Sequence, residues 1–190
     1  MSARVVLGVS GASGAARAMA CAQALRAAGA GVELVLSAMA ERTLDHEVGP
    51  RALADLAALA DRVHALADLG APIASGSFPV AGMIVAPCSM RSLAAIAAGL
   101  DDNLLTRAAS VQLKERRRLV LLAREAPLTL AHLRNMTAVT EMGGIIMPPV
   151  PAFYLRPRDL CEVTRQIAAR AVDVLRLGPP QAAAWTPPPA

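Results

Sequence analysis

A short apolar run, a turn rich in glycine and a helix-forming stretch follow one another near the start of the chain, and this arrangement limits the possible folds most strongly. Residues 4–10 are expected to form a buried parallel strand, and the turn after it leads into a helix over residues 15–28, which Gly29 closes. A second strand is expected over residues 32–36. This order of elements forms one βαβ unit, in which the two strands are parallel.

The remaining chain continues this alternation. Further strands are predicted over 63–67, 81–86, 119–123 and 145–147, and further helices over 38–46, 53–60, 90–98, 104–116, 128–140 and 157–175. The pattern predicts a single-domain α/β fold, a Rossmann-like or flavodoxin-like doubly wound parallel sheet with helices on both faces. Residues 1–178 are expected to form this domain. Residues 179–190, rich in Pro and Ala, are expected to form a tail that is either mobile or packed on a neighbouring subunit.

The composition argues against several classes of protein. The net charge is only +4, and the chain has two Phe, one Tyr and one Trp, so it lacks the aromatic platforms of a nucleic-acid surface. No segment approaches the roughly 20 apolar residues of a membrane span, and the N-terminal apolar run is too short for a signal peptide. We therefore expect a soluble, cytoplasmic protein. Cys21, Cys88 and Cys161 lack metal-ligand spacing and are expected to be buried thiols.

Small and polar residues follow the predicted strands, where open parallel sheets bind their ligands. The turn over residues 8–14 spaces its glycines as G-x-x-G-x-x-G, and the second strand ends in Ser37, where an NAD enzyme would have an acidic residue. The free N–H groups of the next helix would attract a phosphate or an electron-rich ring, although such a turn can also simply pack a helix on a strand. Residues 87–92 repeat this arrangement, with Ser89 as a natural helix N-cap. Two such turns indicate a mononucleotide such as FMN.

A second group of candidates combines basic side chains with a carboxylate and a tyrosine: Arg107, Lys114, Arg124, Glu125, Tyr154 and Arg170. Arg107 and Lys114 are seven residues apart, so they project from one face of a helix. For any one of these residues a surface ion pair is the alternative role. Together they can bind a phosphoryl group and stabilise it as it leaves, because guanidinium groups bind phosphate oxygens in pairs. No Asp/His arrangement for a metal ion is visible, so these cations are expected to act in its place.

Several motifs match one known family in order and spacing: Gly11-Ala-Ser-Gly14, Pro87-Cys-Ser89, Asn103-Leu-Leu-Thr-Arg107, Arg124-Glu-Ala-Pro-Leu128 and Pro148-Pro-Val-Pro-Ala-Phe-Tyr154. Over residues 4–178 the chain resembles the UbiX/Pad flavin prenyltransferases. The resemblance implies that a dimethylallyl group passes from dimethylallyl phosphate to N5 and C6 of reduced FMN. It further implies that the product, prenylated FMN, serves a UbiD-type decarboxylase, and that the protein is a homo-oligomer, commonly a dodecamer.

The resemblance also implies roles for individual residues. Those expected to bind FMN are Gly11, Ala12, Ser13, Ser37, Ser89, Met90, Arg91, Ser92 and Arg124. Those expected around the prenyl phosphate are Arg107, Lys114, Arg124, Glu125, Tyr154 and Arg170. Ser13 would lie near N5, with Glu47 beside it to relay a proton, and Lys114, Glu125 and Tyr154 complete the expected catalytic set. Trp185 of another subunit would help to shelter the allylic cation from water.

Two alternatives remain open on the sequence. An FMN-dependent cysteine decarboxylase of the same fold would need an active-site histidine and a Pro-x-Met-Asn clamp. His46, His64 and His132 fit the first requirement poorly, and Leu133-Arg-Asn-Met136 does not fit the second. A non-catalytic FMN carrier subunit would not depend on Lys114 or Tyr154.

Overall fold

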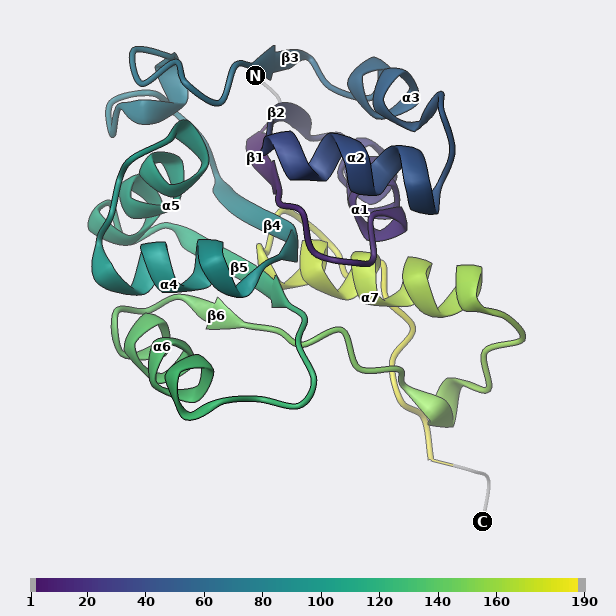
Figure 1. Ribbon diagram of the computed structural model, residues 1–190. Coiled ribbons are helices and arrows are strands. Elements are labelled where there is room, and N and C mark those ends of the chain that lie inside the picture. Colours follow the sequence, from purple (N-terminus) through teal and green to yellow (C-terminus); the bar gives the residue numbers. More distant parts are fainter. Residues whose placement is uncertain (1–2, 188–190) are drawn as a thin grey trace.

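The computed structural model describes residues 3–187, and its centre is a six-stranded parallel sheet (Figure 1). The strands are β1 (Arg4–Val9), β2 (Gly31–Leu36), β3 (Arg62–His64), β4 (Gly82–Cys88), β5 (Arg118–Ala123) and β6 (Ile145–Ile146). Their order across the sheet is β3-β2-β1-β4-β5-β6, and every neighbouring pair is parallel. The predicted fold class is confirmed. The chain adds β2 and β3 on one side of β1 and then adds β4, β5 and β6 on the other side. The strand order therefore reverses between β1 and β4, which is where ligands bind in doubly wound folds.

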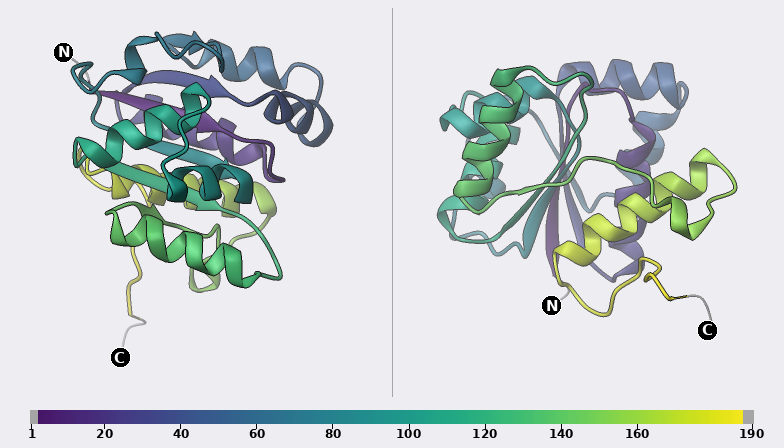
Figure 2. Two further views of the ribbon diagram at one scale, coloured as in Figure 1. Left: turned by 60° about the vertical axis from the view of Figure 1, so that its left-hand side comes forward. Right: turned by 90° about the horizontal axis from the view of Figure 1, so that it is seen from below.

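Helices cover both faces of the sheet. They are α1 (Ala16–Ala27), α2 (Ala38–Glu47), α3 (Ala52–Ala58), α4 (Met90–Ala98), α5 (Leu104–Lys114), α6 (Leu130–Glu141) and α7 (Leu160–Val174), with short 3₁₀ turns η1 (Pro72–Ala74) and η2 (Phe153–Leu155). In Figure 2, α4, α5 and α6 lie on one side of the sheet and α1 and α7 on the other. Alternate residues of β1 pack in two separate cores. Val5 and Leu7 pack in the core beneath α1 and α7, and Val6 packs in the core beneath α4 and α5. Burial on both faces explains why the strand is continuously apolar.

Side-chain caps determine where several helices begin. Ser89 begins α4 as predicted, since its Oγ accepts a hydrogen bond from the Ser92 N–H at 3.2 Å. The last helix begins at Leu160 and not at residue 157, because the Asp159 carboxylate caps it by accepting from the Glu162 N–H at 2.7 Å. Pro157 therefore precedes the cap.

Two further predictions differ from the structure. Strand β4 continues through Pro87 to Cys88, because the Pro87 carbonyl still accepts a hydrogen bond from the Ser10 N–H at 3.2 Å. Cys161 was expected to be buried and is exposed, since it lies in the first turn of α7, where the side chains face solvent. Cys21 and Cys88 are buried, and burial raises the pKa of each thiol to about 12.

Among the described residues, none of the helices is long and apolar enough to cross a membrane. Residues 188–190 of the predicted tail lie outside the described part of the chain. The division at residue 178 stays a prediction.

Gly82, the first residue of β4, sits where no side chain fits. A Cβ there would lie 2.7 Å from the Arg118 carbonyl oxygen and 3.0 Å from Leu175 Cδ2. We predict that Gly82→Ala destabilises the protein by about 1–3 kcal/mol, because the backbone of β5 must move. Gly70→Ala is the control, since its Cβ would meet only Asp68 Oδ1 at 3.4 Å, and it should change stability by about 0.5 kcal/mol or less. Urea unfolding of both variants measures the difference, and equal effects would contradict the steric argument.

Candidate functional site

The carboxyl ends of β1, β2 and β4 meet around a cavity of about 550 Å³ at the point where the strand order reverses. Five of the residues predicted to bind FMN line it: Gly11, Ser37, Ser89, Arg91 and Ser92. We call it the switch-point cavity. Its apolar wall includes Met39, Leu66 and Leu105. The structure thus brings together turns that are far apart in the sequence, as the rule for parallel sheets predicts.

Ser10 joins the turns that form this cavity. Its side chain is buried, and its Oγ donates a hydrogen bond to the Pro87 carbonyl at 2.9 Å and accepts one from the Ser89 N–H at 2.7 Å. On either side, the Ser37 N–H donates to the Val9 carbonyl at 2.9 Å and the Arg124 N–H to the Cys88 carbonyl at 3.3 Å. Sequence reasoning treated Ser10 only as the end of a strand. The available signal was a single hydroxyl at the end of an otherwise apolar strand.

The switch-point cavity has the chemistry that a mononucleotide such as FMN requires. Helices α2 and α4 begin at its edge, and their N-terminal N–H groups and capping hydroxyls can bind a phosphate. Its volume lies in the range of about 300–1,000 Å³ that is usual for small-molecule sites, and its wall has an apolar part for a ring. A Cβ on Gly11 would lie 2.3 Å from Met39 Cβ, so the turn after β1 passes directly against the start of α2. The residues present therefore fit FMN.

A second group of predicted residues lies at the start of α1. Glu47, at the end of α2, accepts hydrogen bonds at Oε2 from the N–H groups of Gly14 at 2.7 Å and Ala15 at 2.8 Å. Partial burial acts to raise the pKa of Glu47, but the hydrogen bonds from Ala15, the Ser13 hydroxyl and Gly14, with the charge of Arg17, lower it below its ordinary value. Ser13 and Glu47 lie close together, and the roles that the resemblance implies for them stay a prediction. The carboxylate occupies the anion site that a helix N-terminus provides.

Arg17 belongs to this group, although sequence reasoning did not select it. Its Nε is buried and has no hydrogen-bond partner among the described residues. Burial lowers the pKa of its guanidinium, the nearby charge of Arg124 lowers it further, and Glu47 opposes the shift. Arginine stays protonated in proteins, so Arg17 carries its charge near a second cation, Arg124, and near the Glu47 carboxylate. The signal was a cation in the first turn of a helix, where the helix dipole disfavours positive charge.

Tyr154 and Arg170 lie together at a smaller cavity of about 130 Å³. Tyr154 comes from η2 and Arg170 from α7, and the tail residues Ala182 and Ala183 complete the lining beside them. Glu125 is exposed, and its Oε1 accepts a hydrogen bond from the Ala126 N–H at 3.0 Å. The other predicted FMN ligands, Ala12, Ser13, Met90 and Arg124, do not line the switch-point cavity, and Met90 packs on the core beneath α4.

Arg107 and Lys114 do not meet the other candidates within one chain. Both approach η1 or the segment directly after it, as their common helix face predicts: Arg107 Nε donates to the carbonyl of Ala74 in η1 at 3.1 Å, and Lys114 Nζ lies close to Gly76. Arg107 also pairs with Asp101 at 3.1 Å and Lys114 with Glu115. Lys114 ends α5 just before β5 begins, so it lies at the amino edge of the sheet. A strand of this length spans on the order of 20 Å from there to the ligand edge.

In the part of the chain that the structure describes, no group of three or more His, Cys, Asp or Glu side chains is placed to hold a metal ion.

The chain is similar to known proteins over nearly its whole length. A family model described as Flavoprotein matches residues 1–169. The flavin prenyltransferase UbiX of Neisseria meningitidis serogroup B is 49% identical over 182 residues, which is 96% of each chain. A crystal structure of a UbiX protein in complex with FMN and dimethylallyl pyrophosphate has a TM-score of 0.93 and 43% identity, covering 98% of this chain and 99% of that one. A dodecameric FMN-dependent UbiX-like decarboxylase of Escherichia coli O157:H7 has a TM-score of 0.91 and 45% identity, covering 97% and 100%.

The contacts of Glu47 make stability depend on pH in a defined direction. Because the folded pKa is lowered from the ordinary 4.5, the ionised carboxylate stabilises the fold above that value, and this contribution is lost as pH falls through the lowered pKa. Glu47→Gln keeps an acceptor oxygen but no charge, so its Tm should be lower than that of the wild type at neutral pH. Since the side chain is largely exposed, we expect a gap on the order of 2 °C that closes at acidic pH. A gap independent of pH would contradict the assignment.

Proposed function

The chain belongs to the flavoprotein family and, within it, to the UbiX flavin prenyltransferases, and on this premise we propose that it joins a dimethylallyl group to reduced FMN. One observation carries the proposal: the turn after β1 connects two parts of the site. Its Gly11 lines a cavity suited to FMN, and its Ser13 belongs to a charged group at the start of α1 that also contains Glu47, Arg17 and Arg124. The similarity to a UbiX protein in complex with FMN and dimethylallyl pyrophosphate supports it. Residues 1–178 would form the FMN-binding domain.

FMN is held by the residues of the switch-point cavity, with Arg124 beside the turn after β4. When bound, reduced FMN supplies the ring atoms N5 and C6 to which the prenyl group is joined. Ser13 and Glu47 would accept the proton that N5 loses when the prenyl carbon bonds to it, since the Ser13 hydroxyl lies beside the carboxylate. Positioned proton transfer of this kind contributes about 10²- to 10⁴-fold in rate. The lowered pKa keeps Glu47 ionised and able to accept that proton.

The donor that we propose is dimethylallyl phosphate, whose leaving group gains negative charge as the allylic bond breaks. Cations placed where that charge develops stabilise the transition state, and they need no reorganisation during the reaction. Arg124 and Arg17 supply such charge at the start of α1, and Arg170 supplies it with the Tyr154 hydroxyl at the smaller cavity. Glu125 orients the loop that carries Arg124 through its contact with Ala126.

Arg107 and Lys114 reach this chemistry only if another copy of the chain contributes them. Both lie on the face of α5 that approaches η1 and the segment directly after it, and Lys114 lies at the amino edge of the sheet. We propose that the protein assembles as a dodecamer in which Lys114 of one copy completes the phosphate site of another. The dodecameric UbiX-like relative supports this arrangement. The product, prenylated FMN, would pass to a UbiD-type decarboxylase in the cytoplasm.

The cysteine decarboxylase alternative has no support in the site. His64 is buried, with its Nε2 2.7 Å from Glu33 Oε2, and His132 accepts the Thr129 N–H at 3.2 Å in the cap of α6. His46 is exposed near the end of α2. Neither the switch-point cavity nor the Tyr154 cavity has a histidine among its described lining residues.

The mass of the flavin tests the proposed reaction. Wild-type protein incubated without oxygen with FMN, dithionite and dimethylallyl phosphate should release a flavin heavier by one five-carbon prenyl unit. Lys114→Ala should still bind FMN but form this product about 10²-fold more slowly, because a charge that stabilises the leaving phosphate is gone. Arg116→Ala, which removes an exposed cation of the same segment, is the control and should react normally. An unchanged flavin mass with wild-type protein would end the proposal, and normal turnover by Lys114→Ala would end the role of Lys114.

Mixed oligomers test whether two copies share one site. Lys114→Ala and Glu47→Gln chains should each be slow when expressed alone. When they are expressed together in equal amounts and assemble at random, about a quarter of the sites should combine a native Glu47 with a native Lys114, and activity should return to about that fraction. If both residues acted within one chain, the mixture would be no faster than its components.

A further inference from the structure

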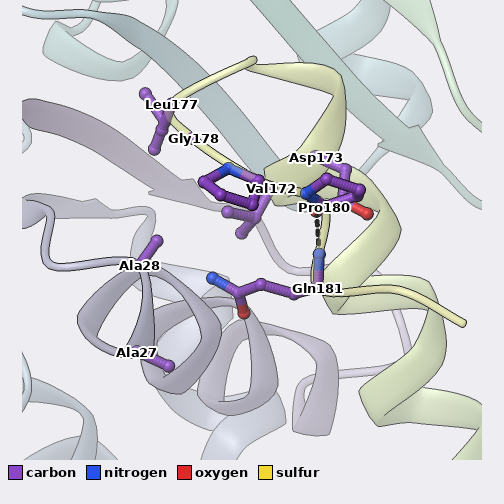
Figure 3. A pocket seen from close by; sticks show the side chains of 9 residues that line it. Ala27, Ala28, Val172, Asp173, Leu177, Gly178, Pro180 and Gln181 are labelled. Carbon is purple, nitrogen blue, oxygen red and sulfur yellow. Dashed lines mark hydrogen bonds between the residues drawn. The ribbon is translucent and has the colours of Figure 1, made fainter.

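The chain that follows α7 turns back along this helix, and Asp173 holds it there. Asp173 Oδ1 accepts a hydrogen bond from the Gln181 N–H at 2.7 Å, and Oδ2 accepts one from the Ala182 N–H at 3.0 Å. Figure 3 shows the Asp173 side chain directed at Gln181 across this turn. The Gln181 side chain also donates from Nε2 to the Ala24 carbonyl of α1 at 3.2 Å. The tail is thus tied to both helices of this face of the sheet.

Asp173 does not serve the helix that carries it. It lies in the last turn of α7, where the helix dipole disfavours a negative charge. Its carboxylate uses both oxygens on the N–H groups of two successive tail residues, and hydrogen bonds to a charged acceptor are about twice as strong as neutral ones. The contacts of Asp173 therefore point to a function in placing the tail.

Leu177 packs against the core at the start of the turn, but Gly178, Pro179 and Pro180 after it are exposed. A cavity of about 470 Å³ lies between the end of α1 at Ala27 and the turn, and Leu177 and Pro180 line its other side (Figure 3). The position of the tail therefore depends on its hydrogen bonds. Pro179 and Pro180 stiffen the segment before Gln181, which reduces the conformational entropy that its fixation costs.

The fixed tail continues to the candidate site. Immediately after the contact with Asp173, Ala182 and Ala183 line the cavity that holds Tyr154 and Arg170. Methyl groups at these two positions provide a small apolar wall beside a phenol hydroxyl and a guanidinium. An isoprenyl phosphate has the matching chemistry, an apolar branched end and an anionic end.

We propose that Asp173 is a positioning residue that clamps the C-terminal tail against the Tyr154 and Arg170 cavity, so that Ala182 and Ala183 form the wall for the dimethylallyl group. This inference rests on the proposed function for the identity of the ligand. The clamp itself concerns the tail and is tested without any substrate.

Trp185 reports on the clamp because it is the only tryptophan of the chain and lies three residues after Ala182. In the intact oligomer, Asp173→Ala should lower the fluorescence anisotropy of Trp185 toward that of a free chain end. Asp173→Asn, which retains one acceptor oxygen, should give an intermediate value. Gln181→Ala is the control, because it removes only the bond to Ala24 and keeps the backbone N–H that Asp173 binds. Unchanged anisotropy in Asp173→Ala would overturn the clamp.

Steady-state kinetics test the wall. Asp173→Ala should raise the KM for dimethylallyl phosphate about tenfold, and leave the affinity for FMN and kcat within about twofold, because only contacts with the donor are lost. A chain that ends at Gly178 should show the same KM, and Asp173→Ala should change it no further in that shortened chain. If Asp173→Ala raised the KM further in the shortened chain, Asp173 would act through α7 and not through the tail. If Asp173→Ala left the KM of the full-length chain unchanged, the tail would form no wall. If the wild type produces no prenylated flavin, the proposed function fails, while the anisotropy result still decides the clamp.

Discussion

The buried hydroxyl of Ser10 connects the two strands between which the sheet reverses its order, and the geometry of the site depends on it. It bonds the carbonyl of Pro87, which also accepts the Ser10 N–H, and at the same time it is the partner of the partly buried Ser89 N–H. An unpaired buried group costs about 1–3 kcal/mol, which makes any other spacing of the two turns unfavourable. The switch-point cavity has a defined width because these turns are fixed relative to each other. The helices that begin there then direct their N-terminal N–H groups into a space of constant shape.

The charge balance at the start of α1 follows from the same turn. Glu47 satisfies two N–H groups of the turn, and its carboxylate balances only one of the two guanidinium groups of Arg17 and Arg124. The local excess of positive charge favours an arriving phosphate. Glu47 stays ionised because the hydrogen bonds it accepts, with the charge of Arg17, lower its pKa against the opposing effect of partial burial. One arrangement therefore prepares both an anion site and a base, without any change in the backbone.

Local patterns predict most of this fold and only part of the site. Strands and helices follow from periodicity, and polar strand ends such as Ser37 and Ser89 follow from the rule for parallel sheets. The proximity of Ser13 and Glu47 could not be derived in this way, because α1, β2 and the rest of α2 separate them in the sequence, and it came from the family resemblance. The shared direction of Arg107 and Lys114 on α5 was predicted correctly. The separation of Lys114 from the other candidates reflects the edge of the sheet at which α5 ends, and periodicity says nothing about which copy of the chain lies opposite.

The contacts of the C-terminal tail could not be predicted from its composition. Its Pro and Ala content is typical of a mobile chain end, yet Asp173 holds it through contacts with Gln181 and Ala182. Ordering the backbone costs about 1–2 kcal/mol per residue in conformational entropy. The hydrogen bonds of one carboxylate, with a stiff Pro-Pro segment, compensate this cost for only a few residues. The contacts that hold the tail therefore exceed its entropy cost by only a small free energy, and we expect the tail to have low local stability. A wall that must admit one small molecule and release a larger one needs such a balance, and a tail packed into the core would not permit it.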